Sequence, residues 1–146
     1  MVIIKIYSQD IYVAAEISVK YADAIAKTLG LTKEDVFLLG SDGALIAEGV
    51  DQVSWFTYLE VTIPANLKHK QDALSKTLLE IFNNYGVHLM IKYDYVTKDN
   101  IVKILNPDFK VFNETMVEVL PTGNYYDEDD VDWDDDWDED EDKEVR

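Results

Sequence analysis

The stretch DAIAKTL at Asp23–Leu29 returns almost unchanged as DALSKTL at Asp72–Leu78, 49 residues further along a chain of 146. In both places the surrounding apolar residues recur with the three-to-four-residue spacing of an amphipathic helix. A helix that occurs twice in so short a chain indicates two copies of one small structural unit. This repeat decides the expected fold, and the sequence around each copy shows what each unit contains.

The first copy is preceded by a strand and followed by another. VIIKIY at Val2–Tyr7 is apolar and β-branched, which predicts a buried strand. Gly30 is placed to end the helix in a left-handed conformation. After a polar turn, Val36–Leu39 predicts a second, short strand, and ALIAEG at Ala44–Gly49 predicts a short return strand.

The second copy has the same surroundings. WFTYLEVTIP at Trp55–Pro64 alternates between apolar and polar residues, which is typical of a strand with one buried face. Asn66 is expected to cap the second helix and Gly86 to close it. VHLMIKYDYV at Val87–Val96 predicts the last strand of the unit.

Each unit therefore reads strand, helix, strand, and the strands within a unit should be parallel with a right-handed crossover. We expect an α/β (α+β) fold: a two-layer sandwich of duplicated β-α-β units, with one mixed sheet and both helices on one face. A C-terminal hairpin is expected from FKVF (109–112), a turn at Asn113 and Glu114, and MVEVL (116–120). The expected domain covers residues 1–121, and a disordered acidic tail covers residues 122–146.

The charge of the chain is unevenly distributed. Its net charge is −17, and residues 127–146 hold 14 acids and two bases, whereas residues 1–126 hold 16 acids and 11 lysines. Both parts repel phosphates, so we expect no direct binding to nucleic acid. Cysteine is absent, which excludes disulfides and thiolate metal sites. No apolar run reaches the roughly 20 residues of a membrane span, and we expect a cytoplasmic protein without membrane contact.

Aromatic residues lie within and just before the acidic tail. Tyr125, Tyr126, Trp133 and Trp137 are spaced as in segments that dock on a basic, partly apolar protein groove. They are the candidate residues for binding a basic protein partner. The alternative is a solvating tail without a specific partner, because dense like charge opposes collapse.

The sequence predicts no metal and no cofactor. Residues 130–141 partly match a calcium-binding loop, but Asp135 stands where the sharp turn needs glycine. His69 and His88 each lack a second histidine nearby, so neither belongs to a zinc-site pattern. The turn GSDG lacks the Gly-Lys-Ser/Thr ending of a phosphate loop.

Four stretches together resemble the tautomerase superfamily, which includes macrophage migration inhibitory factor. They are MVIIKIY at the N-terminus, KTLGLTKEDVFLL, FTYLEVTI and HLMIKYDYVTKDNIVKI, which cover roughly Met1 to Leu105. The chain looks most similar to an uncharacterised bacterial branch in which the β-α-β unit is duplicated within one chain. The resemblance implies a homotrimer and a site at the N-terminus, where a proline amine acts as general base in the family's enzymes.

The chain departs from the family at the residue that carries the chemistry. Val2 follows Met1 in place of proline, and the only arginine is Arg146. If Met1 is removed, Val2 supplies a primary amine with an ordinary pKa of roughly 7.7–8, which is a weak base. Lys33 or Lys5 would then be the cation that holds a substrate carboxylate.

Two functions follow. The first is a non-catalytic, tautomerase-like oligomer (a pseudoenzyme) whose tail contacts a basic partner. The second is a weak or divergent tautomerase or isomerase acting on a small keto–enol acid, with the Val2 amine as base. A homotrimer would protect apolar strand edges such as Val2–Tyr7 from aggregation. Alternatively, the C-terminal hairpin covers that edge within a monomer.

Overall fold

Two β-α-β units form the fold in this computed structural model, which describes residues 1–108 and residue 112. The first unit consists of β1 (Val2–Tyr7), α1 (Ile11–Leu29) and β2 (Val36–Gly40). The second consists of β5 (Phe56–Pro64), α2 (Gln71–Phe82) and β6 (His88–Val96). Within each unit the two strands pair in parallel, which confirms the prediction.

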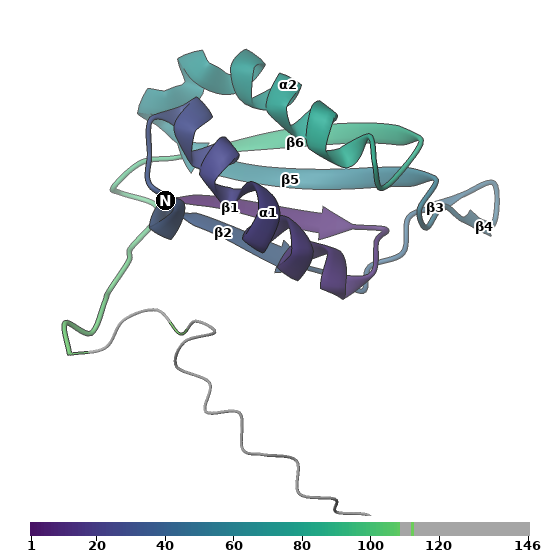
Figure 1. The fold of residues 1–146 in the computed structure, drawn as a ribbon, viewed down its shortest axis with the longest axis horizontal. Helices are drawn as coiled ribbons and strands as arrows, with labels where there is room; N and C mark the ends of the chain where they lie inside the picture. Colours follow the sequence, from purple (N-terminus) through teal and green to yellow (C-terminus); the bar gives the residue numbers. More distant parts are fainter. Residues whose placement is uncertain (109–111, 113–146) are drawn as a thin grey trace, which may run out of the picture. The chain divides into compact units, whose positions relative to one another are not determined.

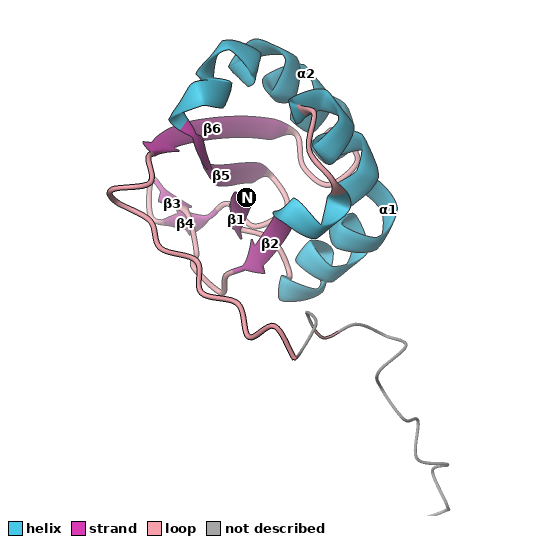
Figure 2. Ribbon diagram, turned by 90° about the vertical axis from the view of Figure 1, so that its left-hand side faces the viewer, coloured by secondary structure: helices cyan, strands magenta, loops and turns pink. Residues whose placement is uncertain are grey.

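The four long strands form one mixed sheet in the order β2-β1-β5-β6. The first strands of the two units, β1 and β5, pair antiparallel at its centre, with Lys5 opposite Glu60. Figures 1 and 2 show both helices packed on one face of this sheet, while no helix of the described residues lies on the other face, called here the helix-free face. The predicted two-layer sandwich is therefore confirmed, and β2 and β6 are the two edges of the sheet.

The repeated stretches meet at equivalent positions. The hydroxyl oxygens of Thr28 and Thr77, which are 49 residues apart, lie 3.0 Å from each other. Each hydroxyl also donates to the carbonyl four residues earlier, at Ala24 and Ala73 respectively. Matching residues in matching contacts, together with the antiparallel central pair, place an approximate twofold axis between the two units.

Local signals explain both ends of α1. The Asp10 carboxylate accepts a hydrogen bond from the Tyr12 amide and caps the N-terminus. Gly30 ends the helix with φ 73°, the left-handed conformation that glycine adopts most easily, as predicted. The Lys70 ammonium donates to the carbonyl of Leu29 at 2.7 Å, so the second unit satisfies one of the free carbonyls of the first helix.

The predicted ends of the second helix are wrong. Ala65–Lys70 form a 3₁₀ helix that contains Asn66, and α2 begins only at Gln71. The tighter turns satisfy backbone groups that Asn66 was expected to cap. The helix ends at Phe82, before Gly86. Gly86 instead lies against the second unit's first strand, since a Cβ there would be 2.7 Å from Thr57 Oγ1.

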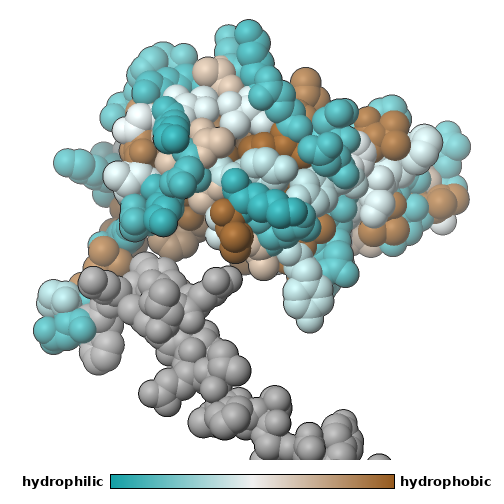
Figure 3. All heavy atoms as spheres, viewed as in Figure 1, coloured by the Kyte–Doolittle hydropathy of each residue, from teal (hydrophilic) through white to brown (hydrophobic). Residues whose placement is uncertain are grey.

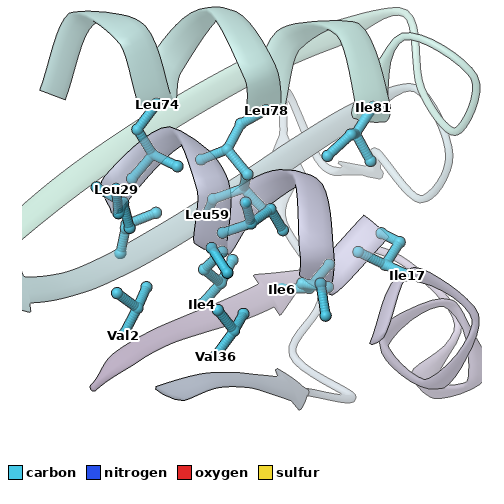
Figure 4. Close-up of a cluster of buried hydrophobic side chains, with 14 of the residues drawn as sticks. Val2, Ile4, Ile6, Ile17, Leu29, Val36, Leu59, Leu74, Leu78 and Ile81 are labelled. Carbon is cyan, nitrogen blue, oxygen red and sulfur yellow. The ribbon is translucent and has the colours of Figure 1, made fainter. Parts of the chain in front are cut away.

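The core lies between the sheet and the helices, as Figure 4 shows. Alternate residues of β1 and β5 point into it, and for β5 this confirms the predicted alternation. Each helix contributes one buried stripe of apolar residues. The largest fully buried side chains are Val2, Ile4, Ile6, Ile17, Ile25, Leu29, Leu59, Val61, Ile63, Leu74, Leu78 and Phe82.

The predicted return strand after β2 is a separate hairpin instead. It consists of β3 (Ile46–Ala47) and β4 (Val50–Asp51), which pair only with each other. Ile46, Val50 and Val53 are exposed, and Figure 3 shows hydrophobic residues gathered at this end of the molecule. The predicted C-terminal hairpin and the acidic tail lie outside the described residues, apart from Phe112. In the described part of the chain, no helix is long and apolar enough to cross a membrane.

Candidate functional site

A pocket of about 480 Å³ opens beside the first residue of the chain. Three parts of the fold form its wall: the start of β1, the end of β5 with the following 3₁₀ helix, and the segment after β6. The lining residues are Met1, Pro64, Ala65, Asn66, Val96, Thr97, Lys98, Ile101 and Lys103.

The wall of the pocket combines apolar side chains with two lysines. Five of its nine lining residues are apolar, and Lys98 and Lys103 carry ammonium groups. Among the described residues, neither lysine has a carboxylate within 4.0 Å. The amine of Met1 lies 3.6 Å from Asp35 Oδ1. Such a wall suits a small molecule with an apolar body and an anionic group.

The segment after β6 is shaped by a short turn. The Thr97 amide donates to Asn100 Oδ1 at 2.7 Å, and the Asn100 amide donates to the Thr97 carbonyl at 3.2 Å. Further along, the Lys103 ammonium lies over the ring of Phe37, 5.4 Å from its centre. Because Phe37 belongs to β2, this segment reaches from one edge of the sheet to the other (Figure 2).

The residues predicted as catalytic are not brought together. The side chain of Val2 is fully buried and points into the core. Lys33 is exposed in a 3₁₀ turn (Lys33–Asp35) and does not line the pocket. Lys5 lies on the helix-free face, with its ammonium 4.6 Å from the ring centre of Tyr7. The residues predicted to bind a partner, Tyr125, Tyr126, Trp133 and Trp137, lie outside the described part of the chain.

The lysines that do line the pocket were missed in the sequence. Lys98 and Lys103 follow β6 in the run TKDNIVKI, where nothing in the spacing distinguishes them from surface lysines. A sheet order of β2-β1-β5-β6 places the end of β6 at the same end of the sheet as Met1. A prediction that included strand order would have found them.

A second polar cluster lies on the helix-free face of the sheet. The Glu60 carboxylate accepts hydrogen bonds from the hydroxyls of Tyr7 (3.0 Å) and Tyr58 (3.2 Å). The Lys92 ammonium lies 3.7 Å from Glu60 and 3.3 Å from Asp94, and the bond to Asp94 raises its pKa. Burial, with a smaller contribution from Glu60, raises the pKa of Tyr58. These contacts order a face that no helix covers.

The two histidines do not form a metal centre. His69 Nδ1 lies 3.0 Å from the Asn66 carbonyl, and His88 packs edge-on against Trp55 at 5.9 Å between ring centres. Within residues 1–108 and residue 112, no group of three histidine, aspartate or glutamate side chains is arranged to hold a metal ion.

The sheet order and the two helices on one face are consistent with the tautomerase-like fold expected from the sequence, and solved structures agree. A domain of unknown function (DUF1904) from Sebaldella termitidis superposes with a TM-score of 0.62 at 10% identity, covering 70% of this chain and 95% of that one. A macrophage migration inhibitory factor-like protein from Entamoeba histolytica gives 0.54 at 13% identity, covering 70% and 93%. Comparison with models of known families and with curated protein sequences gives no match. At these identities the likeness shows the fold alone.

Proposed function

We propose that this protein has a tautomerase-like fold without tautomerase catalysis, and that it binds a small molecule in the pocket beside Met1. The observation that carries the proposal is the pocket itself: an apolar hollow with two lysines that have no carboxylate partner among the described residues. The preferred ligand has an apolar body and a carboxylate. Binding needs only this wall, whereas the family's reaction also needs a base at the first residue.

The N-terminal residues support the absence of catalysis. Val2 stands where the resemblance requires proline, and its side chain is fully buried in the core. The amine of Met1 lies near Asp35, so an anion already faces it. Lys33, the cation expected from the sequence, does not line the pocket. All of these observations agree with one interpretation: the fold and the pocket are kept, but the first residue supplies no general base.

The alternative function is a divergent tautomerase acting on a small keto–enol acid, and it depends on the removal of Met1. Val2 would then carry the terminal amine at the pocket end of β1. The contact of Met1 with the pocket favours this alternative, because the new amine would begin at the same wall. Lys33 would have to move to hold the substrate carboxylate.

The test is an enol-ketonisation assay with phenylpyruvate on the full chain, after the first residue has been identified by intact-mass measurement. We expect the wild type to match the buffer rate. A Val2→Pro variant with Met1 removed should show a measurable increase, because it regains a secondary amine at the pocket. Wild-type turnover well above the buffer rate would refute the non-catalytic proposal and support the alternative.

We also propose that the chain forms a homotrimer. Support comes from the two edges, β2 and the nine-residue β6, which no further strand of the described residues pairs with, and from the ordered cluster around Glu60 on the face opposite α1 and α2. Light scattering coupled to size-exclusion chromatography should give about 50 kDa, three times the 16.8 kDa chain. A particle of one chain mass would refute the trimer.

A basic protein partner for the acidic tail is the last part of the proposal. It is supported by the 14 acids in residues 127–146 and by the aromatic residues among and before them. Pull-downs should compare the full chain with a Trp133→Ala/Trp137→Ala variant, which keeps all of the charge. Loss of a partner in the variant supports aromatic docking. Identical partners from the full chain, the variant and a chain without residues 127–146 indicate a solvating tail.

A further inference from the structure

The segment Thr97–Ile104, here called the strap, crosses one end of the sheet and forms part of the pocket wall. It leaves β6 at one edge, and its Lys103 reaches Phe37 at the other edge. Four strands place these edges roughly 14 Å apart, and seven extended residues span up to about 23 Å. The strap is therefore longer than the distance that it spans, and this extra length allows it to move while the strands stay in place.

The approximate twofold axis provides an internal comparison. The loop after β2 occupies the position in the first unit that the strap occupies in the second. Two backbone hydrogen bonds of 3.1 Å attach that loop to the end of β1, Ser41 N to Ile6 O and Ser8 N to Gly43 O, and a third joins Ser54 N, just before β5, to Ser8 O. The end of the sheet opposite the pocket is thus closed by main-chain bonds.

The strap has no such attachment. The backbone of residues 101–104 makes no hydrogen bond to other described residues. Val102 and Ile104 are 79% and 88% exposed, although both are apolar. Beyond the turn at Thr97–Asn100, the contact that reaches across the sheet is the one between Lys103 and Phe37. An exposed cation–π contact is weak, so the strap is held closed loosely.

Lys103 has two possible partners with different strengths. The Phe37 ring attracts its ammonium only through the ring quadrupole. A carboxylate in the pocket would offer a charge-assisted hydrogen bond, which is stronger and shorter. A ligand of that charge therefore gains by drawing Lys103 away from Phe37, and the strap would follow its lysine toward the pocket.

We propose that the strap is a lid over the pocket beside Met1, and that Lys103, assisted by Lys98, is the specificity-determining residue for a carboxylate. The ligand-free lid is held by Phe37, and the bound ligand replaces that contact. This inference rests on the proposed small-molecule binding. The chemical class of the ligand is a small monocarboxylate with an apolar body.

The experiment is an NMR titration of the full chain with phenylpyruvate and with phenylacetone, which has the same ring and ketone but no carboxylate. We expect the wild type to bind phenylpyruvate roughly tenfold more tightly, as a charged hydrogen bond implies. Lys103→Met should remove most of this preference, and Lys103→Arg should restore it. Lys76→Met, an exposed lysine on α2, is the charge-matched control and should keep the preference.

Phe37→Leu should act in the opposite direction. It removes the competitor for Lys103, so phenylpyruvate should bind roughly two- to fivefold more tightly. NMR order parameters of the backbone amides of residues 101–104 in the ligand-free protein should fall in the same variant. A merely structural lysine would not produce opposite affinity changes in these two variants.

The outcomes separate this inference from the proposed function. If the wild type binds neither probe, both fail. If it binds phenylpyruvate but Lys103→Met and Lys98→Met keep the full preference over phenylacetone, the lid and its lysines are refuted while the binding function stands. Weaker binding by Phe37→Leu would also overturn the lid, because Phe37 would then be part of the pocket.

Discussion

Replacing Ser8 with glycine is expected to stabilise the protein, although the change removes a side chain. Ser8 follows β1 with φ 61°, a left-handed conformation that a residue with a Cβ seldom adopts. Its side chain is buried, with 3% of the residue exposed, and its hydroxyl has no hydrogen-bond partner among the residues that the structure describes. Two unfavourable terms therefore meet at one residue.

Their magnitudes can be separated. The left-handed conformation costs a residue with a Cβ about 1–2 kcal/mol, and the extra freedom of glycine in the unfolded chain returns about 0.5–1 kcal/mol of that. Burial of a hydroxyl without a partner costs about 1–3 kcal/mol. The free energy of unfolding of Ser8→Gly should therefore rise by about 1–4.5 kcal/mol. For a domain of this size, each kcal/mol corresponds to a Tm increase of roughly 4 °C or more.

Urea unfolding followed by circular dichroism measures the change, at a fixed chain concentration because an oligomer's stability depends on it. Ser8→Ala isolates the hydroxyl, since it keeps the strained backbone and removes only the polar group. Ser54→Gly isolates the strain, because Ser54 is exposed and has φ 59°. The gains of these two variants should add to about that of Ser8→Gly.

A decrease in stability for Ser8→Ala would refute the reasoning about the hydroxyl, because it would mean that the oxygen has a partner such as an ordered water. If Ser8→Gly and Ser8→Ala were equally stable, the strain of the left-handed backbone would be no larger than the roughly 0.5–1 kcal/mol that the freedom of glycine in the unfolded chain offsets. Both backbone hydrogen bonds of Ser8, to Gly43 and from Ser54, are kept in every variant.

Three further predictions concern the core, a helix end and pH. Leu78→Ala should lower the free energy of unfolding by about 2–5 kcal/mol, whereas the neighbouring Leu79→Ala, at a side chain 56% exposed, should change it by less than about 0.5 kcal/mol in the same urea titration. Gly30→Ala should cost at least about 1 kcal/mol in thermal unfolding, because φ is 73° and a Cβ would lie 2.8 Å from Lys70 Nζ. Burial raises the pKa of Tyr93 above its ordinary 10.0, so stability should fall as the pH rises past that value, and Tyr93→Phe should flatten this decline in alkaline unfolding curves.

The repeat made most of the fold predictable. Two copies of one helix, each between two apolar strands, leave few ways to bury both helices, and the parallel pairs and the shared face follow from that. Errors occurred where local signals competed. Asn66 is a good capping residue, but the 3₁₀ helix that contains it satisfies the backbone without its side chain. Helix ends are decided by such small free-energy differences, whereas the buried stripes are not.

The site was harder to predict because it depends on strand order. The resemblance to the tautomerase superfamily implies a site at the N-terminus, and Val2 and Lys33 were therefore the predicted catalytic residues. In the fold, the end of β6 lies at the same end of the sheet as Met1, and this brings Lys98 and Lys103 to the pocket. Neither residue has a local signature, since lysines in a polar turn are common on any surface. Only the three-dimensional arrangement distinguishes them.

The duplication also indicates where function should be sought, because it produces two equivalent ends of the sheet that differ in one respect. At the end that holds Ser8, main-chain hydrogen bonds close the structure, and a strained residue is tolerated inside. At the end that holds Met1, the backbone of residues 101–104 makes no hydrogen bond to other described residues, and a pocket remains. Changes at Ser8 should therefore alter stability and leave phenylpyruvate binding unchanged, whereas changes at Lys103 should alter binding and leave stability unchanged. If the two kinds of variant affected both properties alike, the asymmetry between the ends would have no functional meaning.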